Sequence, residues 1–255
     1  MSTVDVHFLG SGDAFGSGGR MQACILLRGA GEALVLDCGA TSLVAMKRAG
    51  VDPNEIGFVA VSHLHGDHFG GLPFLLLDGQ FNRRTKPLVV AGPPGVQARV
   101  HAAMEALYPG SSAAERRFVV EFIEWSERET LRLEGWTVTP FGVVHGSGAP
   151  PFALRAETEG VTIAYSGDTE WTDALVDAAE GADLFICECY ASGRKMRFHT
   201  DFETLQANRH RIACPRIVLT HMGPETLAAE TPGFERAEDG LVLRVIPAAK
   251  PSPPA

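Results

Sequence analysis

The chain has 255 residues, of which 45% are hydrophobic, and its formal net charge at pH 7 is −9. This content is sufficient for one large domain with a full core. The acidic balance argues against a partner such as long nucleic acid, and no run is apolar enough to span a bilayer. The five cysteines form no CxxC pair, so reduced thiols and a cytoplasmic location are expected.

Strand-like apolar runs alternate with helical patterns along the chain, beginning with a strand pattern in place of a signal peptide. The predicted strands are 4–10, 23–28, 33–37, 58–62, 87–92, 117–125, 136–144, 152–158, 161–167, 182–188, 216–221 and 241–246. The predicted helices are 41–50, 69–81, 94–108, 172–180 and 201–213. Many strands with interleaved helices predict an α/β layered protein with mixed sheets. Residues 1–247 are expected to form a single domain, followed by a disordered Pro-rich tail at 248–255.

The stretch His63–His68, with the sequence HLHGDH, places four metal-ligand residue types within six positions after an apolar run. His63 and His65 are two residues apart, so an extended backbone would point both the same way. Gly66 permits a turn, beyond which Asp67 and His68 can address a neighbouring point. A surface loop with scattered histidines would not show this density. One loop could therefore supply half of the ligands for two cations.

Further ligand types stand where other predicted strands end, namely His145, Asp168 and His221. In layered α/β folds the ligand crevice lies at strand ends, because loops can converge there without disturbing the core. We therefore expect these three residues to complete the ligand set.

The segment SHLHGDHFGG resembles the signature of the metallo-β-lactamase fold superfamily, and the resemblance covers nearly the whole chain. The opening FLGSGDAFGSGGR is similar to that of the branch containing RNase Z and small phosphodiesterases. The implied fold is α/β, an αββα four-layer sandwich with two mixed β-sheets flanked by helices. Three further segments resemble conserved elements of the superfamily: LVLDCGA, YSGDT and VLTHM.

The resemblance implies two divalent cations, zinc or alternatively manganese or iron, which would share a hydroxide at neutral pH. The first cation would be held by His63, His65 and His145, and the second by Asp67, His68 and His221. Asp168 would bridge the two cations. Asp67 would also orient the attacking water, and Asp37 would orient a ligand histidine.

The segment 186–209 resembles the part of RNase Z-like proteins that carries a proton donor. On that match His199 protonates the leaving oxygen, Glu188 tunes it and Thr200 lies nearby. The basic residues before His199 could draw in a phosphate. Two structural alternatives stay open: His199 could cap the helix that begins near Asp201, and Glu188 could pair with an arginine.

The expected function is hydrolysis of small or cyclic phosphate diesters. RNase Z carries a long tRNA-gripping arm, whereas residues 146–167 here have room for little more than a hairpin. A small, anionic substrate is therefore expected, and a homodimer is possible. The alternatives are an RNase Z-like ribonuclease, a hydrolase of lactones, thioesters or β-lactams, a mononuclear iron oxygenase and a non-catalytic scaffold.

Overall fold

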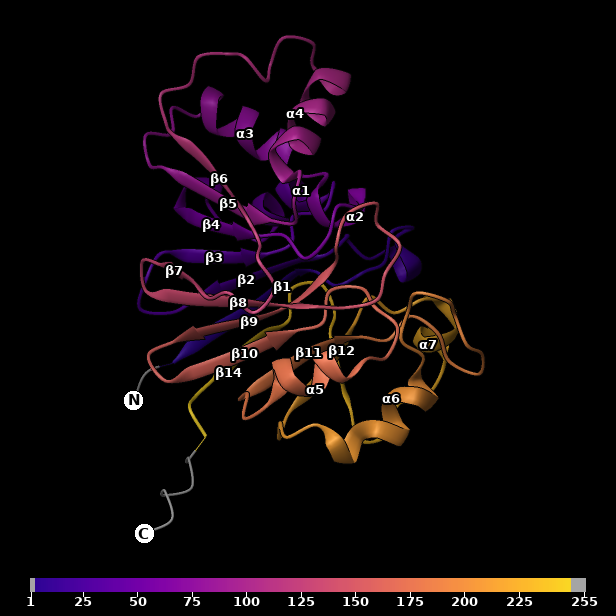
Figure 1. Cartoon of the computed structure of the whole chain (residues 1–255). Coiled ribbons are helices and arrows are strands. Elements are labelled where there is room, and N and C mark those ends of the chain that lie inside the picture. Colours follow the sequence, from indigo (N-terminus) through magenta and orange to yellow (C-terminus); the bar gives the residue numbers. More distant parts are fainter. Residues whose placement is uncertain (1–2, 249–255) are drawn as a thin grey trace.

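The computed structural model describes residues 3–248 and consists of two seven-stranded β-sheets packed face to face, with helices on both outer faces (Figure 1). The layers follow the order αββα. This is the predicted four-layer sandwich, and the fold prediction is confirmed. The predicted tail at 248–255 lies outside the described residues, except for Ala248.

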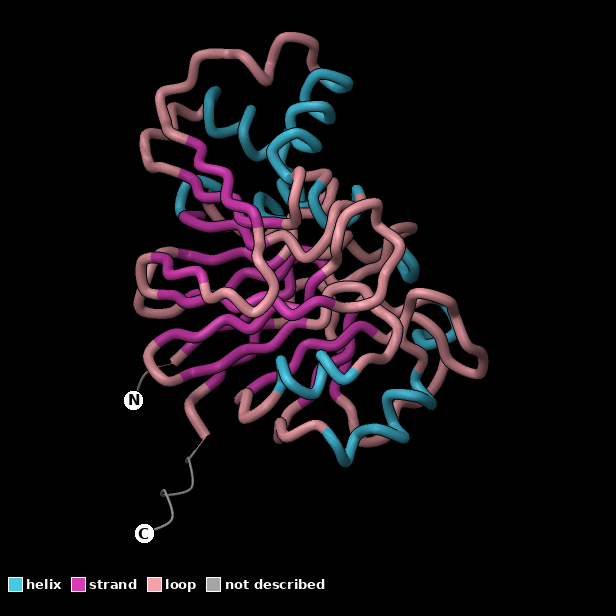
Figure 2. The backbone as a smooth tube through the Cα atoms, viewed as in Figure 1, coloured by secondary structure: helices cyan, strands magenta, loops and turns pink. Residues whose placement is uncertain are grey.

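Each sheet is mixed, as expected, with antiparallel strands on one side and parallel strands on the other. Figure 2 shows the strands in magenta, gathered between the cyan helices. The first sheet has the order β14-β1-β2-β3-β4-β5-β6 and the second β13-β12-β11-β10-β9-β8-β7. The strands of the first sheet are β1 (Val4–Gly10), β2 (Cys24–Arg28), β3 (Ala33–Leu36), β4 (Ile56–Ala60), β5 (Leu88–Gly92), β6 (Val120–Glu124) and β14 (Val242–Val245). Those of the second are β7 (Leu131–Leu133), β8 (Trp136–Gly142), β9 (Phe152–Thr158), β10 (Val161–Tyr165), β11 (Leu184–Glu188), β12 (Ile217–Thr220) and β13 (Glu235–Arg236).

The longer helices lie on the outer faces because they bury apolar side chains against a sheet. In α4, Val96, Val100 and Met104 recur every four residues and are buried. Within the described residues, no helix is both long and apolar enough to cross a membrane. The α-helices are α1 (Ser42–Arg48), α2 (Gly66–Phe69), α3 (Leu72–Phe81), α4 (Val96–Leu107), α5 (Asp173–Ala179), α6 (Phe202–Asn208) and α7 (Pro224–Ala228), and the short 3-10 turns are Ser17–Gly19, Pro53–Glu55 and Arg209–Arg211.

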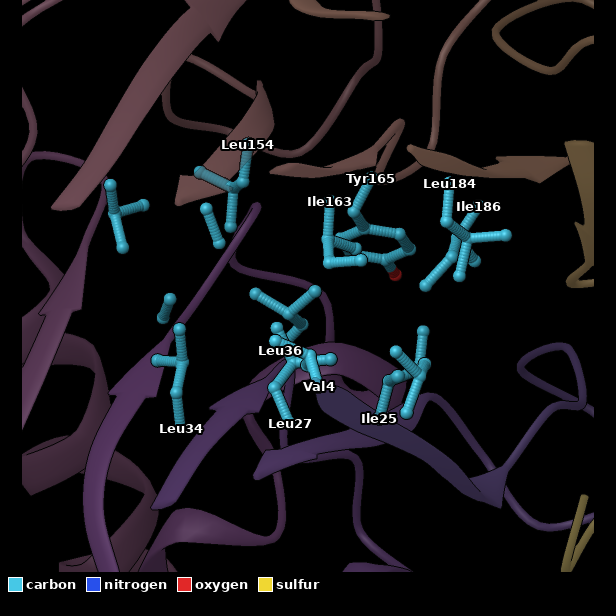
Figure 3. Close-up of a cluster of buried hydrophobic side chains, with 14 of the residues drawn as sticks. Val4, Ile25, Leu27, Leu34, Leu36, Leu154, Ile163, Tyr165, Leu184 and Ile186 are labelled. Atoms are coloured by element: carbon cyan, nitrogen blue, oxygen red, sulfur yellow. The ribbon is translucent and has the colours of Figure 1, made fainter. Parts of the chain in front are cut away.

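Three apolar clusters fill the spaces between the four layers. The central cluster contains side chains of both sheets, such as Leu36 and Ile163, and is shown in Figure 3. A second cluster lies between the first sheet and its helices, and a third between the second sheet and α5 and α6. The sheets are therefore rigid supports for the loops at their edges.

All twelve predicted strands and all five predicted helices are present, with shifted ends. The pattern missed the short strands β7 and β13, the four-residue helix α2 at the predicted turn, and the five-residue helix α7. Strands β4, β10 and β12 are buried throughout, and the chain leaves each of them toward the same edge of the sandwich. Side chains from both sheets can therefore meet at this edge.

Candidate metal centre

The His63–His68 loop begins three residues after β4 and runs into the short helix α2. His63, Asp67 and His68 are buried there, and His65 is half-buried. The loop is held close to the chain beyond β3, because a Cβ on Gly39 would lie 2.2 Å from the backbone oxygen of Asp67. Only glycine allows this approach, which fixes α2 against the first sheet.

The second sheet supplies the remaining three predicted ligands. His145 follows β8, Asp168 follows β10 and His221 follows β12. Asp168 and His221 are buried, and His145 is half-buried. His221 adopts a left-handed backbone with φ 53°, and its amide donates to the Ser11 carbonyl oxygen at 3.1 Å. Such a conformation in a non-glycine residue is uncommon and is often found at functional sites.

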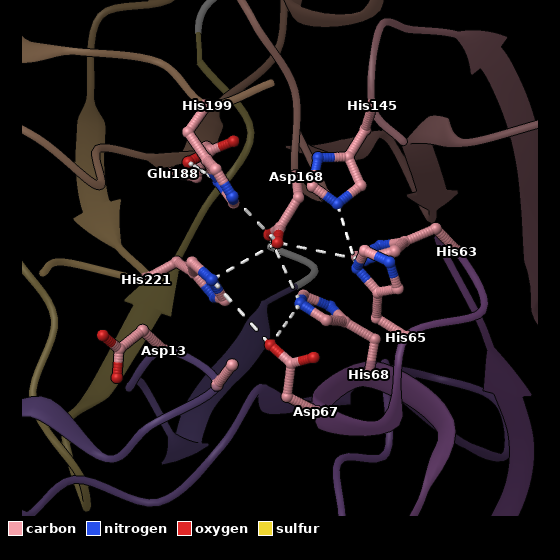
Figure 4. Close-up of polar contacts among 12 residues, drawn as sticks. Asp13, His63, His65, Asp67, His68, His145, Asp168, Glu188, His199 and His221 are labelled. Carbon is pink, nitrogen blue, oxygen red and sulfur yellow. Dashed lines mark hydrogen bonds and ion pairs between the residues drawn. The ribbon is translucent and has the colours of Figure 1, made fainter. Parts of the chain in front are cut away.

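All seven predicted ligands converge at the edge where the two sheets meet (Figure 4). They form two groups, and within each group the possible ligand atoms lie within 4.8 Å of one another. The first, which we call the histidine subsite, is His63, His65 and His145. The second, the carboxylate subsite, is Asp67, His68, Asp168 and His221.

Asp168 lies between the two subsites. One carboxylate oxygen is 3.3 Å from His68 Nε2. The other is 3.3 Å from His221 Nε2 and 3.8 Å from His63 Nε2. Across the histidine subsite, His145 Nε2 is 3.0 Å from His65 Nδ1. Asp168 is therefore placed to serve both groups.

Several buried polar atoms of the cluster have no hydrogen-bond partner within the described part of the chain: His63 Nε2, His68 Nε2 and Asp168 Oδ1. Unpaired buried polar groups are costly and call for an explanation. Imidazole and carboxylate are ligands of zinc and related cations. These residues therefore fit a metal site, and the two groups together could hold two cations.

The protonation states also suit metal binding. Burial lowers the pKa of His63, His145 and His221, which favours the neutral imidazole that a cation requires. Burial alone would lower the pKa of His68, but three carboxylates, led by Asp168, raise it well above the usual value. An excess of buried negative charge therefore surrounds the carboxylate subsite, and a cation would neutralise it.

Asp37 lies behind the ligands as a buried hydrogen-bond hub. Its Oδ2 is 2.7 Å from His68 Nδ1, in agreement with the orienting role expected from the sequence. The same oxygen accepts from the Ser62 hydroxyl at 2.7 Å, and that hydroxyl is 3.1 Å from His63 Nδ1. Tyr165 on the second sheet also donates its hydroxyl to Asp37, at 2.7 Å. Asp37 therefore contacts ligands of both subsites, one directly and one through Ser62.

His199 and Glu188 form a pair beside Asp168. His199 Nδ1 is 3.1 Å from Glu188 Oε2 and 4.0 Å from Asp168 Oδ2. Burial lowers and Glu188 raises the pKa of His199, and the net effect is a rise to about 9. Glu188 also accepts from the Thr169 amide. The pair thus brings a protonated imidazole to the cluster of candidate ligands.

Both structural alternatives for this pair are wrong. The cap of α6 is Asp201, whose carboxylate accepts from the Thr204 amide at 2.9 Å, so His199 is free of that role. Glu188 pairs with His199 and not with an arginine. The basic run before His199 is partly neutralised, because Arg194 pairs with Glu225 at 3.0 Å.

The sequence did not reveal Ser62, Tyr165 or Phe198 as parts of this site. Phe198 contributes its backbone carbonyl, which accepts from His145 Nδ1 at 2.8 Å. The one usable signal was Tyr165 on a buried strand, because a buried hydroxyl normally has a hydrogen-bond partner.

The sequence matches the family of the anti-Pycsar protein Apyc1 over residues 4–240. The chain belongs to this family. It is also similar to a ribonuclease Z of Agathobacter rectalis, with 27% identity over 279 residues, covering 89% of this chain and 90% of the relative.

Solved structures extend the likeness of this Apyc1-family chain. Human tRNase Z, short form (ELAC1), has a TM-score of 0.77 at 26% identity and covers 94% of this chain and 98% of its own. A diphosphatase of the PhnP family has a TM-score of 0.75 at 18% identity, with 94% and 97% covered, and shows the shared fold. The chain is thus a member of the metallo-β-lactamase fold superfamily, and its relatives are hydrolases.

Proposed function

We propose that this protein hydrolyses small or cyclic phosphate diesters at a centre of two divalent cations. The observation that carries the proposal is the His199–Glu188 pair, at 3.1 Å, beside the carboxylate shared by the two subsites. A departing alkoxide is a poor leaving group and needs a proton donor. Hydrolases of activated esters or lactams have less need of such a donor.

The residues divide the work of the reaction. Bound cations would lower the pKa of a water molecule and stabilise charge on the phosphoryl group. Asp67 lies at the edge of the carboxylate subsite, 3.3 Å from His68 Nε2, and would orient the attacking water. His199 directs Nδ1 to Glu188, which leaves Nε2 to protonate the leaving oxygen. Glu188, fully buried, holds the imidazole in this orientation.

The size of the substrate is suggested by the segment between His145 and Asp168. Residues 152–165 form the hairpin β9–β10, which pairs within the second sheet and does not project as an arm. The net charge of −9 also disfavours a long polyanion. An RNase Z-like activity stays the second candidate, because the A. rectalis relative is matched over 90% of its length.

A substrate panel tests the proposal. The purified chain would be reconstituted separately with zinc, manganese and iron and offered bis(p-nitrophenyl) phosphate, a cyclic nucleotide, a lactone, a thioester and a precursor tRNA. We expect turnover of bis(p-nitrophenyl) phosphate and of the cyclic nucleotide. Turnover of the lactone or thioester with inert diesters would contradict it, and efficient cleavage of the tRNA alone would favour the second candidate.

The role of His199 can be tested by His199→Ala. The variant should keep its metal and lose about 10²-fold in kcat on diesters with poor leaving groups. The loss on bis(p-nitrophenyl) phosphate should be smaller, because nitrophenolate departs without protonation. His210→Ala, an exposed histidine, is the matched control. An equal loss on both substrates would remove His199 from the proton-donor role.

A further inference from the structure

Phe198 has an unusual backbone for a bulky residue. Its φ is 69°, in the left-handed region, although it lies between Arg197 and the proposed proton donor His199. Such a conformation costs free energy and persists only where the surrounding structure enforces it. The contacts of Phe198 therefore indicate what the strain maintains.

The two backbone groups of Phe198 face different partners. Its carbonyl accepts from His145 Nδ1 at 2.8 Å. A carbonyl can only accept, so the hydrogen of His145 lies on Nδ1 and the lone pair on Nε2 faces the histidine subsite. Its amide donates to a carboxylate oxygen of Glu170 at 2.7 Å. One residue thus orients a predicted metal ligand and is itself held by Glu170.

The side chain of Phe198 is held as well. A Cβ on Gly146 would lie 3.2 Å from the phenyl ring, so the ring packs directly on the backbone after His145. The guanidinium carbon of Arg197 lies 4.4 Å from the ring centroid. The ring therefore packs against the loop that carries His145.

Glu170 is well placed to hold this arrangement. It follows Asp168 by two residues, and its amide donates to the Val144 carbonyl oxygen at 3.0 Å. Its backbone thus joins the loop of His145, while its carboxylate holds the residue before His199. The segment after Asp168 connects three elements of the site: a shared carboxylate, a histidine ligand and the proton donor.

We propose that Glu170 is a positioning residue that acts through Phe198 on both His145 and His199. The part that concerns His199 rests on the proposed phosphodiesterase function, whereas the part that concerns His145 rests only on metal binding. Without the hydrogen bond to Glu170, the backbone of Phe198 can relax from its left-handed conformation, and its carbonyl then turns away from His145. His145 then loses its orienting partner, and His199 loses its fixed position beside Asp168.

Three substitutions of Glu170 distinguish the reach of its side chain from its negative charge. Glu170→Gln keeps an acceptor of the same reach, Glu170→Asp keeps the charge but shortens the side chain, and Glu170→Ala removes both. Glu203→Ala is the matched control, because Glu203 holds the other end of the same loop by accepting from the Gly193 amide at 2.9 Å.

The first measurement is zinc affinity of the metal-stripped chain, by competition with a chromophoric chelator. Glu170→Ala and Glu170→Asp should bind one of two zinc equivalents about 10-fold more weakly. The zinc affinity of Glu170→Gln should stay within about five-fold of the wild type, because the amide oxygen still accepts the hydrogen bond. A small loss is expected, since a neutral acceptor is weaker than a charged one. Glu203→Ala should match the wild type.

The second measurement compares kcat on a diester with a poor leaving group against kcat on bis(p-nitrophenyl) phosphate. Glu170→Ala and Glu170→Asp should lose about 10-fold more on the former, if His199 is displaced. If zinc binding is weakened but the loss of kcat is the same on both substrates, Glu170 does not position His199, and only its action on His145 stands. Overall inertness toward diesters would refute the proposed function, while the zinc data would still decide the His145 part.

Three results would overturn the proposal on zinc binding. In the first, Glu170→Asp matches the wild type while Glu170→Gln is impaired, which would make charge the cause. In the second, Glu203→Ala weakens zinc binding as much as Glu170→Ala. In the third, all variants bind zinc as the wild type does.

Discussion

The two subsites of the metal centre are supported in different ways. In the carboxylate subsite every predicted ligand is buried, and Asp37, directly after β3 of the first sheet, holds His68 directly. In the histidine subsite His65 and His145 are half-buried, and His145 is oriented by the carbonyl of a loop residue. The carboxylate subsite is therefore enclosed by buried groups, whereas the histidine subsite is completed by the loop that carries Phe198.

The comparison suggests unequal metal affinities. Ligands held by buried hydrogen bonds lose little freedom on binding a cation, whereas a loop must first be ordered. We expect the carboxylate subsite to hold its cation more tightly and the histidine subsite to lose its cation first on chelation. The following substitutions test this difference.

Asp168→Ala should have the largest effect, because its carboxylate lies between the two subsites. We expect loss of both cations and a fall in activity of roughly 10³-fold, on the scale seen when a group that stabilises transition-state charge is removed. Metal analysis and kinetics on a diester would check this. Asp177→Ala, on the surface of α5, is the control. Retention of one tightly bound cation would show that Asp168 serves a single subsite.

Asp37→Ala should weaken the carboxylate subsite most. Removal of a residue that orients a ligand commonly costs 10–100-fold in metal affinity, and we expect about that loss here. His68 and the Ser62 hydroxyl would both lose their acceptor. A two-step zinc titration would resolve the effect. If the weaker step changed instead of the tighter one, the ranking of the subsites would be reversed.

Tyr165→Phe should have a smaller effect on the site, and we expect its main effect on the stability of the fold. It removes one hydrogen bond across the two sheets and leaves Asp37 in contact with His68. We expect a loss of about 1.5–3 kcal/mol in the free energy of unfolding, as for a hydrogen bond to a charged group. Urea denaturation would measure it. Unchanged stability together with unchanged zinc affinity would show that the contact between the sheets is dispensable.

Arg84→Met should leave the site almost unchanged. Arg84 is buried at the opposite end of β4 and donates to four backbone carbonyls, including those of Pro53 at 3.1 Å and Pro87 at 2.7 Å. The substitution should cost about 2–4 kcal/mol of unfolding free energy, because several acceptors lose their donor. Zinc affinity should stay within error of the wild type, and a large change would show that the two ends of β4 are coupled.

The sequence predicted most of the fold because its strands are apolar and are separated by glycines. It also predicted which residues gather at the site. His63, His65, Asp67 and His68 share one short loop, and the other candidates follow strands that end at one edge. The strands β7 and β13 were missed because three and two residues are too few to show a period.

The supporting contacts were beyond sequence reasoning for a different reason. The Tyr165–Asp37 hydrogen bond joins residues 128 positions apart on two sheets, so it depends on how the sheets stack. The hydrogen bond between His145 and the Phe198 carbonyl depends on a left-handed backbone at Phe198, and the sequence gives no sign of it because the residue is not a glycine. Local patterns identify ligands, whereas the residues that orient the ligands are set by tertiary packing.

The central claim is that seven side chains from two sheets together bind two cations. Elemental analysis of the metal-stripped chain after reconstitution with zinc and removal of the excess tests it most directly. We expect two zinc ions per chain, and the zinc ion of the histidine subsite should be lost first as a chelator is added. A chain that holds one zinc ion or none, while fully folded, would contradict it.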